Sequence, residues 1–397
     1  MHLTRYEEKL LEGEEGEAVE RTMRLLVTLG EVFEAERLVE VKGAHISGVS
    51  YLNLGEAGLS FLKEQAEAGA KTRVRATLNP AGMDLQRWKE LRIPQSFAEK
   101  QLQIISAFER MGVEATCTCT PYLVGNEPKL GEQIAWAESS AISYSNSVLG
   151  ARTNRETGPT TLASAVTGRA ALYGYRLAEN RLPTVVVELK DSPRSRLEFS
   201  ALGYVIGTQV GSGVPYIRGV TAPSLEDLKA LGAAAATSGG VALYHMEGVT
   251  PESHSLASID LRSLESFTVD RGTLEETISK LSTEVKQPIT CLGCPHCSLR
   301  EVEVAARLLE GKRLKERLWV FTSRGVYADA ERRGFVDVIE GAGGKVFRDT
   351  CMVVAPLEEM GVAEVSTNSC KAAQYLANRG IKVALGNANR LLKEATK

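Results

Sequence analysis

From about residue 317 onward, the chain alternates between short apolar runs and longer amphipathic segments, and this alternation constrains the fold more than any other feature. Short runs rich in β-branched residues predict strands, whereas apolar residues at a helical period predict helices. Strands that alternate with helices form parallel sheets with helices on their faces. The pattern predicts strands at 317–322, 345–348, 362–367 and 381–385, and helices at 327–341 and 371–378.

The rest of the chain is less regular but carries the same two kinds of element. The first forty residues have apolar residues at helical spacing, and the Gly/Ser-rich segment 43–50 is expected to be a loop. Pro183 marks the start of an apolar strand, and Ser224 has the position and type of a helix N-cap. Further helices are expected at 57–68, 96–111 and 223–232, and further strands at 72–77, 113–118 and 184–189.

The length of 397 residues exceeds the ~250–300 residues at which a single core usually divides, so several domains are expected. The predicted fold class is α/β, with parallel or mixed sheets flanked by helices. We expect an N-terminal α/β region at 1–130, a central α/β region at 131–285 and a C-terminal α/β region at 286–397.

Three residues that could carry chemistry each follow a predicted strand. They are Cys119, Cys351 and Lys371, and the last also opens a predicted helix. Ligands of open α/β sheets bind outside the carboxyl ends of strands. The three residues therefore share one kind of position in the fold, although spacing alone leaves open whether these strand ends converge.

Composition excludes several classes of function. The net charge is −3 and no Lys/Arg-rich stripe is present, which argues against a nucleic-acid partner. The acidic N-terminus lacks the apolar segment of a signal peptide, and no run of ~20 apolar residues could span a membrane. We therefore expect a cytoplasmic protein.

The cysteines are the clearest candidates for a metal or redox site. An odd number of cysteines in a reducing compartment argues against a disulfide framework. Grouped cysteines in such a compartment are typical of metal ligands or reactive thiols, whereas Cys370 alone is more simply a small buried apolar residue. The seven are Cys117, Cys119, Cys291, Cys294, Cys297, Cys351 and Cys370.

The densest group, CLGCPHC, permits three interpretations. With His296 it resembles part of a zinc site, although a second C-x-x-C pair is missing. Cys294 and Cys297 have the spacing of a thiol oxidoreductase pair. Three thiolates could also hold an iron–sulfur cluster that leaves one iron open to substrate, supplied either by the local triplet or by Cys119, Cys294 and Cys351. Residue types and spacing leave these alternatives open.

Eight stretches together resemble the aconitase X family, and they extend over nearly the whole chain. The longest, AESSAISYSNSVLGARTNRE at 137–156, is also the most specific. The others are HISGVSYLNLGEAG, TLNPAGMD, CTPY, GVTPE, GCPH, DTC and TNSCKAAQY, and they occur in the order expected of the family.

This resemblance implies an aconitase-like architecture of several domains around a [4Fe–4S] cluster with one open iron. It places the three cluster ligands at Cys119, Cys294 and Cys351, so Cys291 and Cys297 are incidental neighbours of the GCPH motif.

The resemblance also implies a hydro-lyase. Two activities are associated with the family: dehydration of (R)-5-phosphomevalonate to trans-anhydromevalonate 5-phosphate, which we favour, and dehydration of cis-3-hydroxy-L-proline. The length is that of a large subunit whose separate small subunit carries a swivelling domain and the catalytic serine. A metal-bearing scaffold without catalytic activity is the remaining alternative.

The family motifs mark further candidates around a small hydroxy-acid substrate. Glu138, Ser139 and Lys371 are candidate catalytic residues. Glu138 is expected either to act as a general acid for the leaving hydroxide or to orient iron-bound water, and Lys371 to bind a substrate anion. Arg152 and Arg155 either bind substrate carboxylate or phosphate, or support their loop. The remaining expected substrate contacts are Gly48, Val49, Ser50, Asn79 and Pro80.

Overall fold

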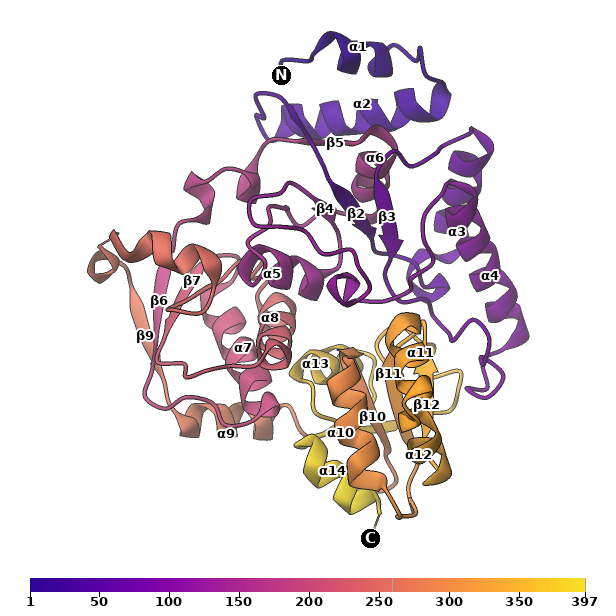
Figure 1. Ribbon diagram of the computed structural model, residues 1–397, viewed down its shortest axis with the longest axis vertical. Coiled ribbons are helices and arrows are strands. Elements are labelled where there is room, and N and C mark those ends of the chain that lie inside the picture. The colour runs from indigo at the N-terminus through magenta and orange to yellow at the C-terminus, as the bar shows by residue number, and fades with distance from the viewer. Residues whose placement is uncertain (259, 397) are drawn as a thin grey trace.

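The computed structural model describes residues 1–258 and 260–396 and confirms the α/β class. Three lobes, each built around a parallel sheet, follow one another along the chain (Figure 1). The N-terminus lies at the end of the first lobe and the C-terminus at the opposite end of the molecule, in the third lobe. Over the described residues, the helices lack the combination of length and apolar character that crossing a membrane requires.

The first lobe holds a three-stranded parallel sheet in the order β3-β2-β4 and a small antiparallel pair, β1-β5. The helices α3 and α4 pack against each other, and α6 packs against β2. Its elements are α1 (Arg5–Leu11), α2 (Glu17–Val32), β1 (Leu38–Glu40), β2 (Gly43–Ile46), α3 (Tyr51–Glu67), β3 (Arg75–Leu78), α4 (Gln95–Arg110), a 3₁₀ turn (Pro121–Leu123), β4 (Ala135–Trp136), α5 (Ser139–Ser147), α6 (Gly158–Thr167) and β5 (Arg169–Ala171).

The second lobe holds a four-stranded parallel sheet in the order β8-β7-β6-β9. Its helices α7 and α8 pack closely, and α8 also contacts α5 of the first lobe. Its elements are 3₁₀ turns (Gly174–Arg176 and Glu179–Arg181), β6 (Val185–Leu189), α7 (Arg196–Val210), β7 (Pro215–Arg218), α8 (Leu225–Ser238), β8 (His245–Met246), 3₁₀ turns (Pro251–Ser258 and Leu261–Ser263), β9 (Ser266–Val269) and α9 (Arg271–Lys280).

The third lobe holds a five-stranded parallel sheet in the order β12-β11-β10-β13-β14. Its helix α13 also packs against α7 and α8 of the second lobe, so this helix lies near the centre of the molecule (Figure 1). Its elements are β10 (Ile289–Cys297), α10 (Leu299–Leu309), β11 (Leu318–Thr322), α11 (Arg324–Arg332), α12 (Phe335–Gly341), β12 (Lys345–Arg348), β13 (Glu364–Thr367), α13 (Cys370–Asn378), β14 (Lys382–Leu385) and α14 (Ala388–Ala395).

The alternation predicted from residue 317 onward is confirmed, with one correction. The predicted helix 327–341 is two helices, α11 and α12, because Gly334 between them adopts the left-handed conformation with a φ of 77°. Ser224 caps α8 as predicted, since its hydroxyl accepts a hydrogen bond from the Asp227 amide.

Two predictions in the first lobe are wrong. The expected loop 43–50 begins with β2, the central strand of the sheet, whose residues are all buried. The expected strand 113–118 is irregular and keeps only a single bridge, from Glu114 to Thr77. Cys117 explains the irregularity, because its φ of 43° is incompatible with an extended strand. Cys119 therefore follows a loop rather than a strand.

The predicted domain boundaries at 130 and 285 stay predictions. Residues on both sides of 130 share the first sheet, because β2 pairs with β4 as well as with β3. The second and third sheets take their strands from separate stretches of the chain.

The contact between α7 and α8 gives a test of the fold. A Cβ atom at Gly203 of α7 would lie 2.1 Å from the Leu231 carbonyl oxygen of α8. We expect Gly203→Ala to lower the free energy of unfolding by about 1–3 kcal/mol, the usual effect of overpacking. Helix propensity alone predicts a gain of about 1 kcal/mol, the opposite sign.

Gly272→Ala in α9 is the matched control, because its Cβ would meet its nearest atom at 3.5 Å. Urea denaturation of both variants measures the difference. A Gly203→Ala protein as stable as wild type would contradict the close approach of the two helices.

Candidate active site

A cavity of about 660 Å³ lies where the first and third lobes meet. It draws on the segments that follow β3, β4 and β12, on β10 itself and on the first turn of α13. The carboxyl ends of parallel strands from two different sheets thus face one space, as expected for a ligand site in α/β proteins. Of the residues predicted from sequence, those lining it are Gly48, Asn79, Pro80, Cys119, Glu138, Ser139, Cys294, Cys351 and Lys371.

Three thiols from three separate segments share this cavity. Cys119 comes from the loop after the irregular segment, Cys294 from β10 and Cys351 from the loop after β12. All three are buried, and burial raises the pKa of each thiol, to about 12 for Cys294. Buried thiols grouped in one cavity form a donor set suited to a soft metal centre.

The local triplet is dispersed by the strand that carries it. All of CLGCPHC lies in β10, which is irregular here because Gly293 has a φ of 108° and the register against β11 shifts between Leu292 and Cys297. Cys297 packs in a different apolar cluster from Cys291 and Cys294. Ligands of one zinc ion lie within about 4 Å of each other. Throughout 1–258 and 260–396, no three His, Cys, Asp or Glu side chains converge as ligands of a single metal ion do, which argues against the zinc interpretation.

His296 is likewise committed to protein partners rather than to a metal. Its Nε2 lies 2.8 Å from the carbonyl oxygen of Thr350, and its Nδ1 lies 3.0 Å from the hydroxyl of Thr118. Burial lowers the pKa of His296 to about 4, so the ring is neutral at pH 7. The oxidoreductase interpretation is also disfavoured, because Cys294 and Cys297 lie within a strand and burial raises the pKa of both thiols to about 12.

Lys371 and Glu138 form an ion pair in the wall of the cavity. The Lys371 Nζ lies 2.6 Å from Glu138 Oε1, and each side chain is only 7% exposed. Glu138 is also the N-cap of α5, where it accepts hydrogen bonds from the Ala141 amide and the Ser140 hydroxyl. Burial opposes ionisation, yet Lys371 and these donors hold the pKa of Glu138 below its ordinary value.

The same pair keeps Lys371 charged. Burial alone would lower the pKa of Lys371, but the Glu138 carboxylate raises it above its ordinary value. The anionic partner expected for Lys371 from its position in the first turn of α13 is therefore supplied by the chain itself. The ammonium group remains at the cavity wall, within 3.1 Å of the Ser140 hydroxyl.

The loop after β2 supports the cavity in two ways. Gly48 lines it, with a φ of 74° that favours glycine, whereas Val49 is buried behind it. Ser50 caps α3 and donates its hydroxyl to the Val354 carbonyl oxygen at 2.8 Å. The loop of the first lobe is thereby joined to the segment that carries Cys351.

Arg152 and Arg155 lie elsewhere. Arg152 donates a hydrogen bond to the Arg176 carbonyl oxygen at 3.0 Å, which fits the supporting role considered for it. Arg155 is exposed and lines a different cavity, of about 540 Å³, together with Tyr173 and Tyr175. That these two residues bind a substrate anion stays a prediction, because neither of them lines the cavity that contains the cysteines.

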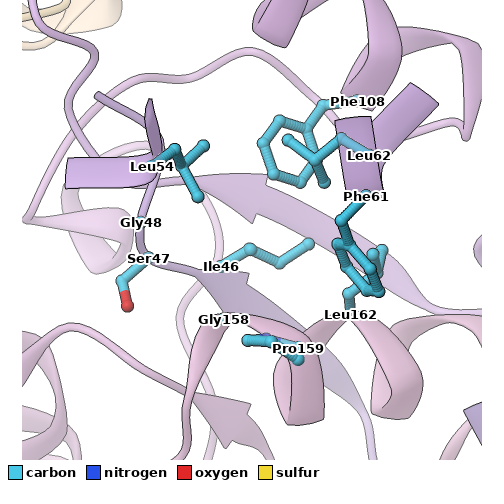
Figure 2. A pocket seen from close by; sticks show the side chains of 10 residues that line it. All are labelled: Ile46, Ser47, Gly48, Leu54, Phe61, Leu62, Phe108, Gly158, Pro159 and Leu162. Carbon is cyan, nitrogen blue, oxygen red and sulfur yellow. The ribbon is translucent and has the colours of Figure 1, made fainter. Parts of the chain in front are cut away.

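A smaller cavity of about 130 Å³ adjoins the loop after β2 from the other side. Figure 2 shows that its walls are almost entirely carbon: Phe61, Leu62, Phe108 and Leu162 surround it, and the Ser47 hydroxyl points away from them. This cavity lacks the charged and thiol groups that the larger one offers, so we place the candidate active site in the larger one.

Sequence patterns gave no indication of several residues that organise the site. Ser140 contacts both charges of the ion pair, and Thr118 and Thr350 hold the ring of His296. Each directly adjoins a residue that was predicted, namely Ser139, Cys119 and Cys351. Ser140 and Thr350 lie inside two of the family motifs and Thr118 directly precedes a third, so a position within or beside a motif was the available signal.

Comparison with known families gives a match along almost the entire chain. The models described as Aconitase X first, second and third domain match residues 1–179, 183–279 and 288–397 respectively.

Individual proteins agree with this match. The phosphomevalonate dehydratase large subunit of Methanocaldococcus jannaschii is 48% identical, over 99% of this chain and 100% of that protein. The cis-3-hydroxy-L-proline dehydratase of Pseudomonas aeruginosa is 35% identical, over 96% of this chain but 68% of that protein. The crystal structure of Thermococcus kodakaraensis aconitase X in its holo form is 42% identical and covers 100% of both chains with a TM-score of 0.94.

The ion pair gives a testable coupling. Glu138→Gln leaves Lys371 buried without its carboxylate, and we expect this to lower the free energy of unfolding by about 3–5 kcal/mol. Lys371→Met should have a comparable effect. The free energy of unfolding of the double variant should fall by clearly less than the sum of the two single effects, because neither buried charge is then left without its partner.

Urea denaturation of the four proteins measures this coupling. Glu276→Gln, in the exposed pair with Lys280, is the control and should change stability little. Additive losses in the double variant would show that the two charges do not stabilise each other.

Proposed function

The chain belongs to the aconitase X family, and from this we propose that it is the large subunit of a phosphomevalonate dehydratase. The proposed reaction removes water from (R)-5-phosphomevalonate to give trans-anhydromevalonate 5-phosphate. Identity to the archaeal large subunit is higher than to the cis-3-hydroxy-L-proline dehydratase, and it extends over the whole of that subunit. The observation that carries the proposal is the cavity in which three thiols and a buried ion pair meet.

The residues of the cavity fit an iron–sulfur cluster. Cys119, Cys294 and Cys351 are buried thiols with raised pKa values, so a cationic metal centre would supply the positive charge that their thiolates need. We propose that they hold a [4Fe–4S] cluster. Such a cluster, with one iron left open, acts as a Lewis acid on a leaving hydroxyl and a neighbouring carboxylate.

Glu138 acts as a hydrogen-bond acceptor rather than a general acid in this proposal. Its pKa is held below the ordinary value, so the group is a carboxylate at neutral pH. It keeps the Lys371 ammonium charged and oriented, and it can accept a hydrogen bond from a substrate hydroxyl. Ser139, whose hydroxyl lies 3.5 Å from the Lys371 Nζ, presents a second hydroxyl at the same wall.

Lys371 and Asn79 are the proposed contacts to the substrate. The charged ammonium of Lys371 can bind a substrate carboxylate or phosphate. Asn79 Oδ1 is buried and lacks a hydrogen-bond partner within the described part of the chain, so a substrate hydroxyl would satisfy it. Pro80 restricts the turn that holds Asn79 at the cavity, and Gly48, in the loop after the neighbouring strand β2, lines the same cavity.

Removal of a proton next to the carboxylate still needs a base. Among the described residues that line the cavity, both carboxylates are engaged in ion pairs, Glu138 with Lys371 and Glu358 with Arg379. We propose that a separate small subunit carries a swivelling domain whose serine serves this step. The cavity opens to the surface, so a second chain can reach it.

The ligand set can be tested through iron content. We expect protein purified without oxygen to contain iron and sulfide. The iron content of each of Cys119→Ser, Cys294→Ser and Cys351→Ser should be at least about tenfold lower than that of wild type, because a cluster that lacks one of its three thiolates is labile. Cys291→Ala and Cys297→Ala are matched controls from the same strand and should retain iron.

Iron analysis and visible absorption spectra measure the outcome. Loss of iron in the Cys291→Ala and Cys297→Ala proteins, with retention in Cys351→Ser, would favour the local triplet. A wild-type protein that holds zinc without iron would refute the cluster.

The substrate can be tested with the small subunit added. We expect dehydration of phosphomevalonate and no turnover of cis-3-hydroxy-L-proline. Lys371→Met should lower kcat/KM by about 10²–10³, the usual result of removing one charged contact to the reacting groups. Turnover of hydroxyproline alone would reverse the assignment. Measured iron content of the variant separates loss of a substrate contact from loss of the cofactor.

A further inference from the structure

We propose that His296 is a positioning residue that locks the three cysteine segments of the cavity into one arrangement. This inference rests on the proposed function only in treating Cys119, Cys294 and Cys351 as a ligand set. His296 itself lies two residues beyond Cys294 in β10, and it is completely buried. Its four polar atoms contact three segments of the chain, namely residues 118–119, Lys229 and Thr350.

The ring connects the residues that precede the other two cysteines. Nε2 lies 2.8 Å from the Thr350 carbonyl oxygen, next to Cys351, and Nδ1 lies 3.0 Å from the Thr118 hydroxyl, next to Cys119. Because a carbonyl oxygen only accepts, Nε2 carries the proton, and Nδ1 of the neutral ring accepts from Thr118. One imidazole thereby sets the distance between two segments that lie more than two hundred residues apart in the sequence.

The backbone of His296 completes the arrangement. Its amide donates to the Cys119 Sγ at 3.2 Å, and its carbonyl oxygen accepts from the Lys229 Nζ at 2.8 Å. Lys229 belongs to α8 of the second lobe and is itself paired with Glu301 of α10. The residue therefore receives contacts from all three lobes at the point where they meet.

The Thr118 hydroxyl is oriented by further contacts. The Thr120 amide donates to Thr118 Oγ1 at 3.2 Å, and the Thr120 hydroxyl lies 3.0 Å from the same oxygen. With Thr118 donating to His296, the Thr120 hydroxyl donates to Thr118. This chain of hydrogen bonds is buried throughout, so removing the imidazole leaves unsatisfied groups beside Cys119 and Cys351.

Substitution of His296 by Asn or by Gln can separate the two hydrogen bonds that the ring makes. In His296→Asn, Oδ1 occupies the place of Nδ1 and keeps the contact to Thr118 but loses that to Thr350. In His296→Gln, Nε2 occupies the place of the ring Nε2 and keeps the contact to Thr350 but loses that to Thr118. His296→Leu loses both.

The first measurement uses metal-free protein, so it does not depend on any cofactor. The rate of iodoacetamide labelling of each cysteine is followed by peptide mass spectrometry. We expect Cys351 to label about tenfold faster in His296→Asn, Cys119 about tenfold faster in His296→Gln, and both faster in His296→Leu, since one buried hydrogen bond corresponds to about this factor. Cys291 and Cys370, buried in the core, should label at wild-type rates.

Equal acceleration at all cysteines would mean that the variants merely destabilise the fold, and unchanged labelling at Cys119 and Cys351 would mean that His296 holds neither segment. Either result overturns the proposal.

The second measurement is the rate of iron release to a chelator from protein purified without oxygen. We expect His296→Leu to release iron at least about tenfold faster than wild type, with the Asn and Gln variants between them. If the wild-type protein contains iron and all three variants release iron at the wild-type rate, the positioning role is refuted. Iron absent from the wild-type protein refutes the proposed cofactor instead, while the labelling result still decides the inference.

Discussion

The buried ion pair between Lys371 and Glu138 is the interaction on which the rest of the site depends. Glu138 caps α5 in the first lobe, where a carboxylate is favoured by the helix dipole, whereas Lys371 lies in the first turn of α13, where a cation is disfavoured. Both side chains are 7% exposed, so neither charge is stable there without the other. The pair therefore fixes how the first and third lobes meet, and it places a permanent positive charge at the cavity wall.

The grouping of the Cys119, Cys294 and Cys351 thiols likewise depends on how the first and third lobes dock. The loop carrying Cys119 belongs to the first lobe, whereas Cys294 and Cys351 belong to the third. Ser50 reaches the Val354 carbonyl oxygen, and the Ala81 amide donates to the Asp349 carbonyl oxygen at 2.7 Å, so two loops of the first lobe hold the segment around Cys351. The three thiols therefore share one cavity only in the folded chain.

From residue 317 onward, sequence patterns predicted the third lobe well, because its strands there are short apolar runs between amphipathic helices, and periodicity reports such burial directly. The same reasoning failed for β2, whose glycine and small residues conceal a buried strand. It also failed for 113–118, where the left-handed Cys117 interrupts a segment of alternating apolar and polar residues. It missed β10 entirely, because CLGCPHC has neither a strand period nor β-branched residues.

For the site, the family motifs marked most of the predicted residues that line the cavity. The partner of each side chain could be read only from the hydrogen bonds of the folded chain. Glu138 and Lys371 were predicted separately, but only the fold shows that they are partners. The motif left Arg152 either a substrate contact or a support for its loop, and in the fold its guanidinium donates to the Arg176 carbonyl oxygen. A motif records which residues a family shares, and it does not distinguish a residue that contacts ligand from one that supports the loop beside it.

The dispersal of the local triplet has a consequence for folding. Cysteines that are close in sequence could bind a metal in an unfolded chain, whereas Cys119, Cys294 and Cys351 converge only after the lobes have docked. A ligand that binds the folded chain alone stabilises it in proportion to its occupancy. Cluster binding would therefore strengthen the contact between the first and third lobes, and loss of that contact, through the ion pair or through His296, would release the cluster. Binding of the proposed cluster and docking of the lobes would then be coupled in one equilibrium.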